Sequence, residues 1–268
     1  MTSASAAPTS SEGSRQTYEE MAPYYDAFSA HHDYELWLAN LLPMAERFGL
    51  RGRRLLDVAC GTGKSFLPLL DSDWQITAVD ASPGMLEQAQ RKAHGRVRLQ
   101  VADMRELPIF GDFDLVFVLG DALNYLLSDE QLHSALSGLR RNLAPDGLLL
   151  FDLNTLLTYR TFYAETSVKE HQGKRLTWHG QTPANPTPGA LAQATFEVKE
   201  IGANGAAPLC VSVHRQRHYP AESVTAALDR AGLQCLAVFG QHFDARLHQP
   251  LDETRHTKGV FIARSRDK

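Results

Sequence analysis

Carboxylates near the ends of apolar runs, together with one glycine-rich turn, are the residues of this chain whose spacing could do chemistry. Gly61 and Gly63 lie in the turn and leave bare backbone that a ligand can approach closely. Asp57 precedes the turn. Asp80 follows Gly61 by about 20 residues, the spacing at which an acidic residue hydrogen-bonds ribose hydroxyls in nucleotide-binding α/β folds. The pattern therefore indicates a site for a ligand that contains a nucleoside.

The sequence of this turn does not match either of two known nucleotide-binding motifs, and each mismatch is at one residue. The dinucleotide fingerprint needs glycine or alanine three positions after its second glycine, where this chain has Phe66. The phosphate loop ends in Gly-Lys-Ser, as residues 63–65 do, but it needs a glycine at the position of Val58. An ordinary strand–turn–helix of an α/β domain remains an alternative for the turn taken alone.

The stretch 57–63, Asp-Val-Ala-Cys-Gly-Thr-Gly, resembles motif I of the class I (Rossmann-like) S-adenosylmethionine-dependent methyltransferases of the small-molecule type. The resemblance covers about residues 54–154 and implies S-adenosyl-L-methionine as cofactor and S-adenosyl-L-homocysteine as product. It assigns Asp80 to the ribose, Asp103 to the adenine amino group and Asp121 to a place beside the sulfonium. The cofactor contacts that it implies are Tyr18, Tyr25, Asp57, Ala59, Gly61, Gly63, Asp80, Ala81, Met85, Asp103, Met104 and Leu119.

These side chains need strands whose carboxyl ends meet at one edge of a sheet. The apolar runs that predict the first five strands lie at 55–58, 75–79, 97–101, 113–119 and 148–153, and the helical segments between them at 64–70, 83–94 and 129–142. Such alternation predicts a doubly wound, largely parallel sheet that binds ligands at the carboxyl ends of its strands. Together with the resemblance, it predicts an α/β fold: a seven-stranded mostly parallel sheet, an antiparallel β insertion after strand five and an N-terminal helical lid.

The chain is expected to divide into five segments. They are a disordered N-terminal tail (1–16), the helical lid (17–50), the cofactor-binding core (51–165), the antiparallel β insertion (166–219) and the C-terminal part of the core (220–268). The lid contains Tyr-x-x-x-Ala-x-x-Tyr-Asp, which resembles the N-terminal segment of many small-molecule methyltransferases, where the tyrosines line the pockets. A helical pair that only covers one sheet edge is the alternative. The insertion covers the substrate or contacts a second copy in a homodimer, and both alternatives stay open.

Methyl transfer is an in-line displacement at a sulfonium carbon, so alignment and exclusion of water can supply much of the catalysis. A base is needed only where the acceptor atom carries a proton. We expect Asp121 and His214 as catalytic candidates. His31 and His32 could also act as a base, although adjacent histidines in a polar loop are commonly solvated. The expected substrate contacts are Tyr24, Asn124, Tyr125 and Asn154.

A metal site is a further possibility that the spacing disfavours. Asp121, Asp152 and Asn154 have some likeness to the magnesium site of catechol methyltransferases. There the acid and the amide after strand five are adjacent, whereas Leu153 separates them here. The polar loop 241–258 contains three histidines without a metal-site spacing. We therefore expect no metal.

The amino-acid composition indicates which binding partners and which cellular location to expect for the protein. Lys and Arg total 27 against 31 Asp and Glu, a net charge of −4, and no basic run is present, so nucleic-acid binding is not expected. Three well-separated cysteines suit a reducing compartment, and no apolar stretch approaches the length of a membrane span. A cytoplasmic protein without a membrane partner is expected.

The expected function is transfer of a methyl group from S-adenosyl-L-methionine to an oxygen or nitrogen of a small-molecule acceptor. A specialised metabolite, an amino sugar and an amino acid are the acceptor classes considered. The alternatives are a protein or RNA methyltransferase and a protein that binds S-adenosylmethionine without catalysis.

Overall fold

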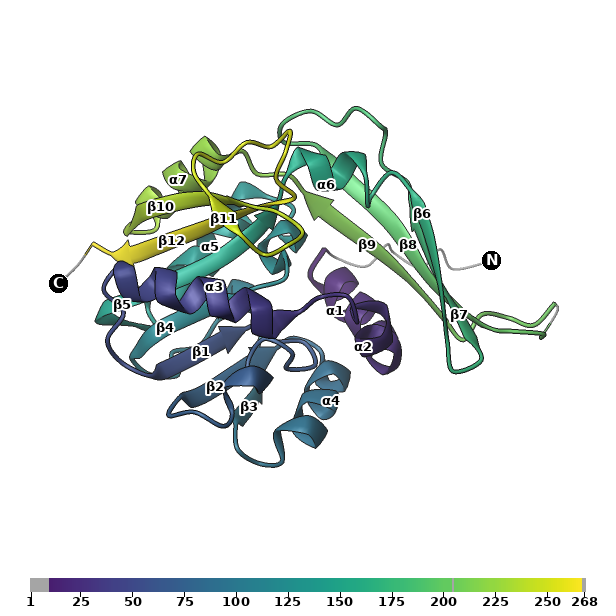
Figure 1. Ribbon diagram of the computed structural model, residues 1–268, viewed down its shortest axis with the longest axis horizontal. Coiled ribbons are helices and arrows are strands. Elements are labelled where there is room, and N and C mark those ends of the chain that lie inside the picture. Colours follow the sequence, from purple (N-terminus) through teal and green to yellow (C-terminus); the bar gives the residue numbers. More distant parts are fainter. Residues whose placement is uncertain (1–9, 204, 267–268) are drawn as a thin grey trace, which may run out of the picture.

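The structure is a computed structural model that describes residues 10–203 and 205–266. Its main sheet has the strand order β11-β10-β12-β5-β4-β1-β2-β3. These strands are β1 (Arg54–Val58), β2 (Gln75–Asp80), β3 (Arg98–Val101), β4 (Phe113–Val118), β5 (Leu143–Asn154), β10 (Leu233–Gln241), β11 (Leu247–His248) and β12 (Lys258–Ser265). Strands β1 to β5 pair in parallel, whereas β12 is antiparallel to both β5 and β10 (Figure 1).

The expected mostly parallel α/β sheet is confirmed, but its strand count is eight rather than seven. The extra strand, β11, is two residues long and pairs with Gly240 and Gln241 at the end of β10. It lies in the loop that the sequence predicts to be irregular. A strand this short has no alternating pattern that periodicity could reveal.

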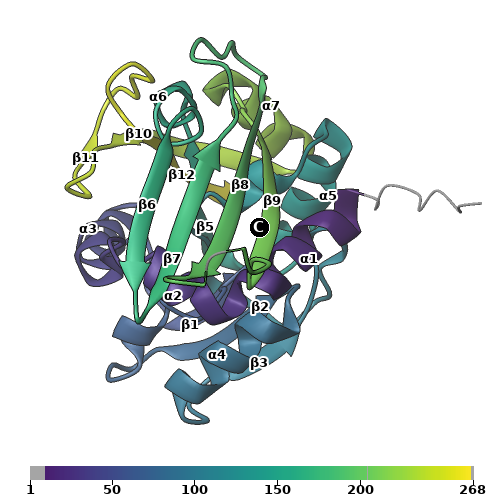
Figure 2. The same cartoon turned by 90° about the vertical axis from the view of Figure 1, so that its right-hand side faces the viewer.

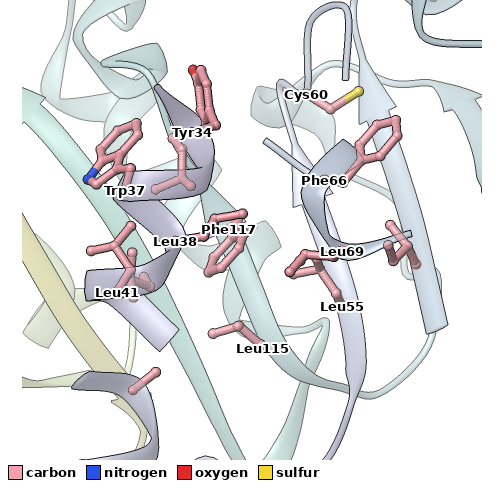
Figure 3. Packing of buried hydrophobic residues seen from close by; sticks show 14 of the residues in the cluster. Tyr34, Trp37, Leu38, Leu41, Leu55, Cys60, Phe66, Leu69, Leu115 and Phe117 are labelled. Carbon is pink, nitrogen blue, oxygen red and sulfur yellow. The ribbon is translucent and has the colours of Figure 1, made fainter. Parts of the chain in front are cut away.

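Helices cover both faces of the main sheet. They are α3 (Tyr34–Arg47) and α4 (Pro83–Ala93) on one face, and α5 (Asp129–Arg140) and α7 (Ala221–Arg230) on the other. Neighbouring residues of β1 lie on opposite faces of the sheet: Leu55 packs with α3 and α4, and Leu56 packs with α5 and α7. Figure 3 shows the first cluster, with Leu38 of α3 beside Phe117 of β4. Burial on both faces explains why these strands read as continuous apolar runs.

The prediction of a helix at 64–70 is wrong. The chain there forms turns and one 3₁₀ helix, Leu67–Leu69. Pro68 lacks the N–H that a continuing α-helix would use, and the Phe66 ring turns back over Gly63. Serines cap the starts of α4 and α5: the side chains of Ser82 and Ser128 each accept a hydrogen bond from the backbone N–H three residues later.

The N-terminal segment folds into α1 (Ser10–Met21), a 3₁₀ turn (Ala22–Tyr24) and α2 (Tyr25–Phe28). Residues 1–9 of the expected disordered tail lie outside the described residues, and residues 10–16 contradict that expectation because they belong to α1. Tertiary contacts hold this polar helix in place: the Thr17 hydroxyl donates to the Val213 carbonyl (2.9 Å), and the Glu19 carboxylate accepts from Ser82 and Gly84 of the α4 start.

The insertion is a separate antiparallel sheet of β6 (Thr166–His171), β7 (Lys174–Gly180), β8 (Leu191–Glu200) and β9 (Cys210–Arg217), reached through α6 (Leu156–Arg160). Figure 2 shows these four strands side by side, with β6 and β9 at the edges. Runs at 174–178, 191–201 and 209–219 predict β7, β8 and β9 from the sequence, whereas no such run predicts β6, whose residues are all exposed. The inner face of this sheet packs on the N-terminal helices through an aromatic cluster that includes Phe28, Trp178 and Phe196.

No helix in the described ranges is long and apolar enough to cross a bilayer.

Candidate functional site

The turn after β1 is tied to the end of β2 by the Asp80 carboxylate. Its Oδ2 accepts a hydrogen bond from the Gly61 N–H (2.8 Å), and its Oδ1 accepts one from the Ser82 N–H (2.9 Å). Burial raises the pKa of Asp80 to about 6, against the lowering effect of these N–H donors. Gly61 has a φ of +54°, and a Cβ placed on it would contact only the Tyr25 ring, at 3.9 Å. The turn therefore presents open backbone beside a carboxylate.

This turn forms one wall of a first cavity, which most of the expected cofactor contacts line. They are Tyr18, Tyr25, Ala59, Gly61, Asp80, Ala81, Asp103, Met104 and Leu119. The structure thus gathers side chains from α1, α2 and the carboxyl ends of β1 to β4 around one space. Ser14 and Arg15, which lie in α1 within the segment expected to be a disordered tail, also reach this cavity.

Three expected contacts do not line the first cavity. Asp57 lies beneath the turn, where its carboxylate accepts a hydrogen bond from the Ser65 hydroxyl, and burial raises its pKa to about 7. Met85 is fully buried in the core. Gly63 is needed for packing, because a Cβ there would come within 2.5 Å of the Phe66 ring. These residues shape the turn from behind.

Arg105 is a cavity residue that sequence reasoning missed. Its Nε donates to Asp103 Oδ1 (2.8 Å), its guanidinium also pairs with Asp103 Oδ2, and its backbone N–H donates to Oδ1 (2.9 Å). The carboxylate expected to bind adenine is therefore already charge-neutralised by a neighbour. The signal available in the sequence was an opposite charge two residues after Asp103, in a short turn.

A second, larger cavity of about 270 Å³ lies between the main sheet, the N-terminal helices and the insertion. The expected residues Asp121, Tyr125, Asn154 and His214 line it. Its walls are largely aromatic. They include Phe28, Phe162, Tyr163 and Trp178.

Two expected substrate contacts are elsewhere. Asn124 is wholly buried: its Nδ2 donates to the Tyr159 hydroxyl (3.1 Å) and to the Arg217 carbonyl (2.8 Å), while its Oδ1 accepts from the Asn154 N–H (2.9 Å). It holds the loop after β4 to β5 and β9. Tyr24 packs against the aromatic cluster of the insertion and lines neither cavity.

Lys258, which the sequence did not single out, lies between two carboxylates at the second cavity. Its Nζ is 2.8 Å from Asp121 Oδ1 and 2.6 Å from Asp152 Oδ2. Burial opposes its charge, but the two carboxylates outweigh burial and raise the pKa of the ammonium. Asp152 also accepts the N–H groups of Gly120 (2.7 Å) and Asp121 (2.9 Å). An ammonium thus lies where the comparison with the catechol enzymes would place a metal ion.

Within residues 10–203 and 205–266, no three His, Cys, Asp or Glu side chains are arranged to hold a metal ion.

His214 reaches the second cavity from β9, but its ring is hydrogen-bonded at both nitrogens. Nδ1 lies 2.8 Å from the Tyr125 hydroxyl, and Nε2 lies 3.2 Å from the Ser212 hydroxyl. Burial lowers the pKa of His214 to about 3, despite the nearby Asp121. The ring is therefore neutral at ordinary pH.

His31 and His32 also line the second cavity, with ring centroids 4.1 Å apart. Burial, with a smaller contribution from the neighbouring ring, lowers the pKa of His32 to about 3. Burial and Lys169 lower the pKa of His31. Neither histidine adds a stable positive charge to the cavity.

The two cavities meet at a shared wall. Tyr18, Tyr25, Tyr34, Gly120 and Tyr125 line both of them. A group held in the first cavity can therefore face a group held in the second across this tyrosine-rich junction.

Comparisons with known proteins point to one family. A family model described as a methyltransferase domain matches residues 55–147. A malonyl-[acyl-carrier protein] O-methyltransferase of Geobacter sulfurreducens is 34% identical over 196 residues, which cover 70% of this chain and 71% of that protein. A methyltransferase-like protein of Geobacillus is 36% identical over 148 residues, covering 54% of this chain and 59% of that protein.

A dTDP-3-amino-3,6-dideoxy-alpha-D-glucopyranose N,N-dimethyltransferase of Streptomyces fradiae is 30% identical over 135 residues, which cover 50% of this chain and 52% of that protein. Among solved structures, an S-adenosylmethionine-dependent methyltransferase from Clostridium acetobutylicum has a TM-score of 0.75 at 20% identity, covering 92% of this chain and 98% of that chain. A sugar N-methyltransferase from Streptoalloteichus has a TM-score of 0.68 at 24% identity, covering 91% and 93%. These structures share the fold of this chain.

Proposed function

Because the chain belongs to the class I S-adenosylmethionine-dependent methyltransferases, we propose that it transfers a methyl group to an amino nitrogen of a small molecule. S-adenosylmethionine is the cofactor, and when bound it supplies an electrophilic methyl group on a positively charged sulfonium. The observation that carries the proposal is the tyrosine-rich junction: a donor cavity and an acceptor cavity share one wall, and Asp121 stands on the acceptor side of it.

The first cavity suits this cofactor. Asp80 offers the remaining lone pairs of its carboxylate to the ribose hydroxyls, as the acidic residue after the second strand does in related α/β folds. The open backbone at Gly61 leaves room for the amino-acid end. Asp103 and Arg105 would hold the adenine edge together, since their side chains are paired in the wall.

The charges around the second cavity favour an amine over an acid as acceptor. Asp121 and Asp152 share the single ammonium of Lys258, so the cluster keeps one negative charge in excess. The buried histidines are neutral because their pKa values are lowered. A carboxylate substrate would face this negative excess with no uncommitted ammonium, whereas an ammonium substrate complements it.

The aromatic walls support the same choice. Tyr18, Tyr125 and Trp178 lie around His214 with ring centroids 4.9 to 6.1 Å from it, and together they face the cavity. Aromatic faces attract ammonium and methylammonium groups through their quadrupoles. An amine keeps or regains its positive charge after each methyl transfer, so such walls suit both substrate and product.

An ammonium acceptor must lose one proton before its nitrogen lone pair can attack. We assign that proton to Asp121, the carboxylate at the junction. Lys258 and Gln216 hold it in place: the Lys258 ammonium binds Oδ1, and the Gln216 amide donates to Oδ2 (2.6 Å). Tyr18 and Tyr25, which are partly exposed and line both cavities, exclude water from the same space because the lid places them over the junction.

The test is methyl transfer from radiolabelled S-adenosylmethionine to sets of small molecules that share a carbon skeleton and differ in one group: amine, hydroxyl or carboxylate. Amino sugars and their parent sugars form a suitable set. The proposal expects label on the amines alone. Label only on hydroxyls or carboxylates would overturn it, and label on no acceptor would favour a binding protein without catalysis.

A further inference from the structure

Tyr125 is the junction tyrosine whose hydroxyl is joined to a buried chain of polar groups. Its oxygen lies 2.8 Å from Nδ1 of His214, whose Nε2 lies 3.2 Å from the hydroxyl of Ser212 on the same strand. Ser212 and His214 are each about 2% exposed. In a buried hydrogen-bonded chain of this kind the proton positions are coupled, because unpaired polar groups in such a place are strongly disfavoured.

The direction of the Tyr125–His214 hydrogen bond depends on the tautomer of the His214 ring. Burial keeps the His214 ring neutral, so one ring nitrogen carries a proton and donates a hydrogen bond, and the other nitrogen accepts a hydrogen bond. The distances allow two arrangements: the Tyr125 hydroxyl donates to Nδ1 while Nε2–H points to the Ser212 oxygen, or Nδ1–H points to the Tyr125 oxygen while the Ser212 hydroxyl donates to Nε2. In the first arrangement the Tyr125 oxygen presents a lone pair to the junction, and in the second it presents its O–H.

We propose that Ser212 and His214 are positioning residues that draw the Tyr125 hydroxyl proton away from the junction, so that the Tyr125 oxygen accepts a hydrogen bond from the N–H group of the methyl acceptor. The Nε2–H of His214 then points to the Ser212 oxygen. The proposal rests on the amine-directed function above. In this arrangement the acceptor's N–H faces Tyr125, and its lone pair is left to face the donor cavity across the same wall.

The opposite arrangement would hinder the reaction. If Nδ1 of His214 carried the proton, the Tyr125 O–H would point into the cavity and donate to the nitrogen lone pair that must attack the methyl group. The neutral His214 tautomer thus decides whether Tyr125 orients the nucleophile or blocks it. We call the hydrogen-bonded chain Ser212–His214–Tyr125 the relay. It orients protons, and no proton is transferred along it.

The relay also sets a limit on the product. Primary and secondary amines have an N–H group that Tyr125 can hold, but a tertiary amine has none in its neutral, nucleophilic form. Successive transfers are therefore expected to stop at the dimethylated amine, because the third transfer would lack the orienting hydrogen bond.

The experiment uses the full chain, labelled S-adenosylmethionine and the best amine found in the acceptor sets. The variants are Tyr125→Phe, His214→Leu, His214→Gln and the double variant Tyr125→Phe/His214→Leu. His179→Leu, a substitution on β7 outside both cavities, is the matched control. Cofactor-dependent thermal stabilisation with S-adenosylhomocysteine confirms that each variant is folded.

We expect Tyr125→Phe and His214→Leu each to lower kcat about tenfold, the loss of one orienting hydrogen bond. Because His214 acts through Tyr125, the double variant should fall no further than Tyr125→Phe alone. His214→Gln should recover most of the activity, since its amide oxygen can accept a hydrogen bond from the Tyr125 hydroxyl. The pH profile of kcat/KM should keep its shape in every His214 variant.

If the two single losses in kcat multiplied to about a hundredfold in the double variant, His214 and Tyr125 would act independently, and the relay would be overturned. An unchanged kcat in His214→Leu would also overturn it. Loss of an inflection near pH 6.5 in His214→Leu would show a general base instead. Failure of the relay is separable from failure of the function: in the first case the wild type still methylates amines, and in the second it methylates none, which overturns both.

Discussion

The ammonium of Lys258 lies 2.6 Å from Oδ2 of Asp152, and the Asp152 side chain is completely buried. Asp152 in turn accepts the N–H groups of Gly120 and Asp121, which form the loop between the two cavities. The Lys258–Asp152 ion pair therefore links β12 to the loop at the junction. This ion pair fixes the position of the Asp121 carboxylate.

Replacing Lys258 with methionine should leave a buried carboxylate without its partner. We expect Lys258→Met to lower the free energy of unfolding by about 3 kcal/mol, the usual result of breaking a buried pair from one side. Urea unfolding monitored by tryptophan fluorescence measures it. Lys199→Met, which removes the exposed pair with Glu197, is the control and should change stability by less than about 1 kcal/mol. Equal losses in the two variants would contradict the structural role of Lys258.

Asp57 predicts a dependence of stability on pH. Burial raises its pKa to about 7, with the Ser65 hydroxyl opposing the shift, whereas an unfolded chain has a value of about 4. The native state thus holds the proton more tightly, so this contribution to stability is present below about pH 4 and is lost as pH rises to about 7.

Asp57→Asn should remove that dependence while keeping an acceptor for Ser65. Relative to the wild type, the variant should gain about 2 kcal/mol of stability between pH 5 and pH 8. Urea unfolding of both proteins at the two pH values gives the difference directly. A difference that stays constant with pH would mean that Asp57 is ionised in the folded protein throughout this range.

The N-terminal lid is fastened to the core at Glu19. Its Oε2 accepts hydrogen bonds from the Ser82 hydroxyl (2.6 Å) and from the Gly84 N–H (2.9 Å) at the start of α4, where a negative charge is favourable. Since α1 carries Tyr18 over the junction, loosening this contact should weaken cofactor binding.

For Glu19→Gln we expect the Kd of S-adenosylhomocysteine to rise about fivefold, equivalent to ~1 kcal/mol. Isothermal titration calorimetry measures it. Glu20→Gln is the control: Glu20 pairs with Gln16 inside α1 and should leave the Kd unchanged. If both substitutions have no effect, α1 does not close the donor cavity.

Local patterns were enough to predict β1 to β5, the turn after β1 and the place of Asp80 and Asp103 at strand ends. Each of these depends on residues close together in the sequence and on the rule that ligands bind at the carboxyl ends of parallel strands. The pairing of Lys258 with Asp152 could not be predicted this way. It depends on β12 inserting antiparallel beside β5, in the register that sets Lys258 opposite Asn154.

Two other misses have the same origin. Helix α1 begins in a polar stretch that reads as disordered, and contacts distant in sequence, Thr17 with Val213 and Glu19 with Ser82, hold it in place. Strand β6 has no buried face of its own and exists because it pairs along β7. Tertiary context decides both elements, and propensity alone does not.

The position of the transferred methyl group tests the central claim most directly. The protein is incubated with S-adenosylmethionine labelled with ¹³C at the methyl carbon and with an amino sugar that offers both amine and hydroxyl groups, and the product is examined by ¹³C–¹H correlation NMR. We predict that the labelled carbon is bound to nitrogen and that the Asp121→Asn variant forms much less of this product. A labelled methyl group on oxygen, formed equally well by the variant, would contradict the assignment of the second cavity to an amine.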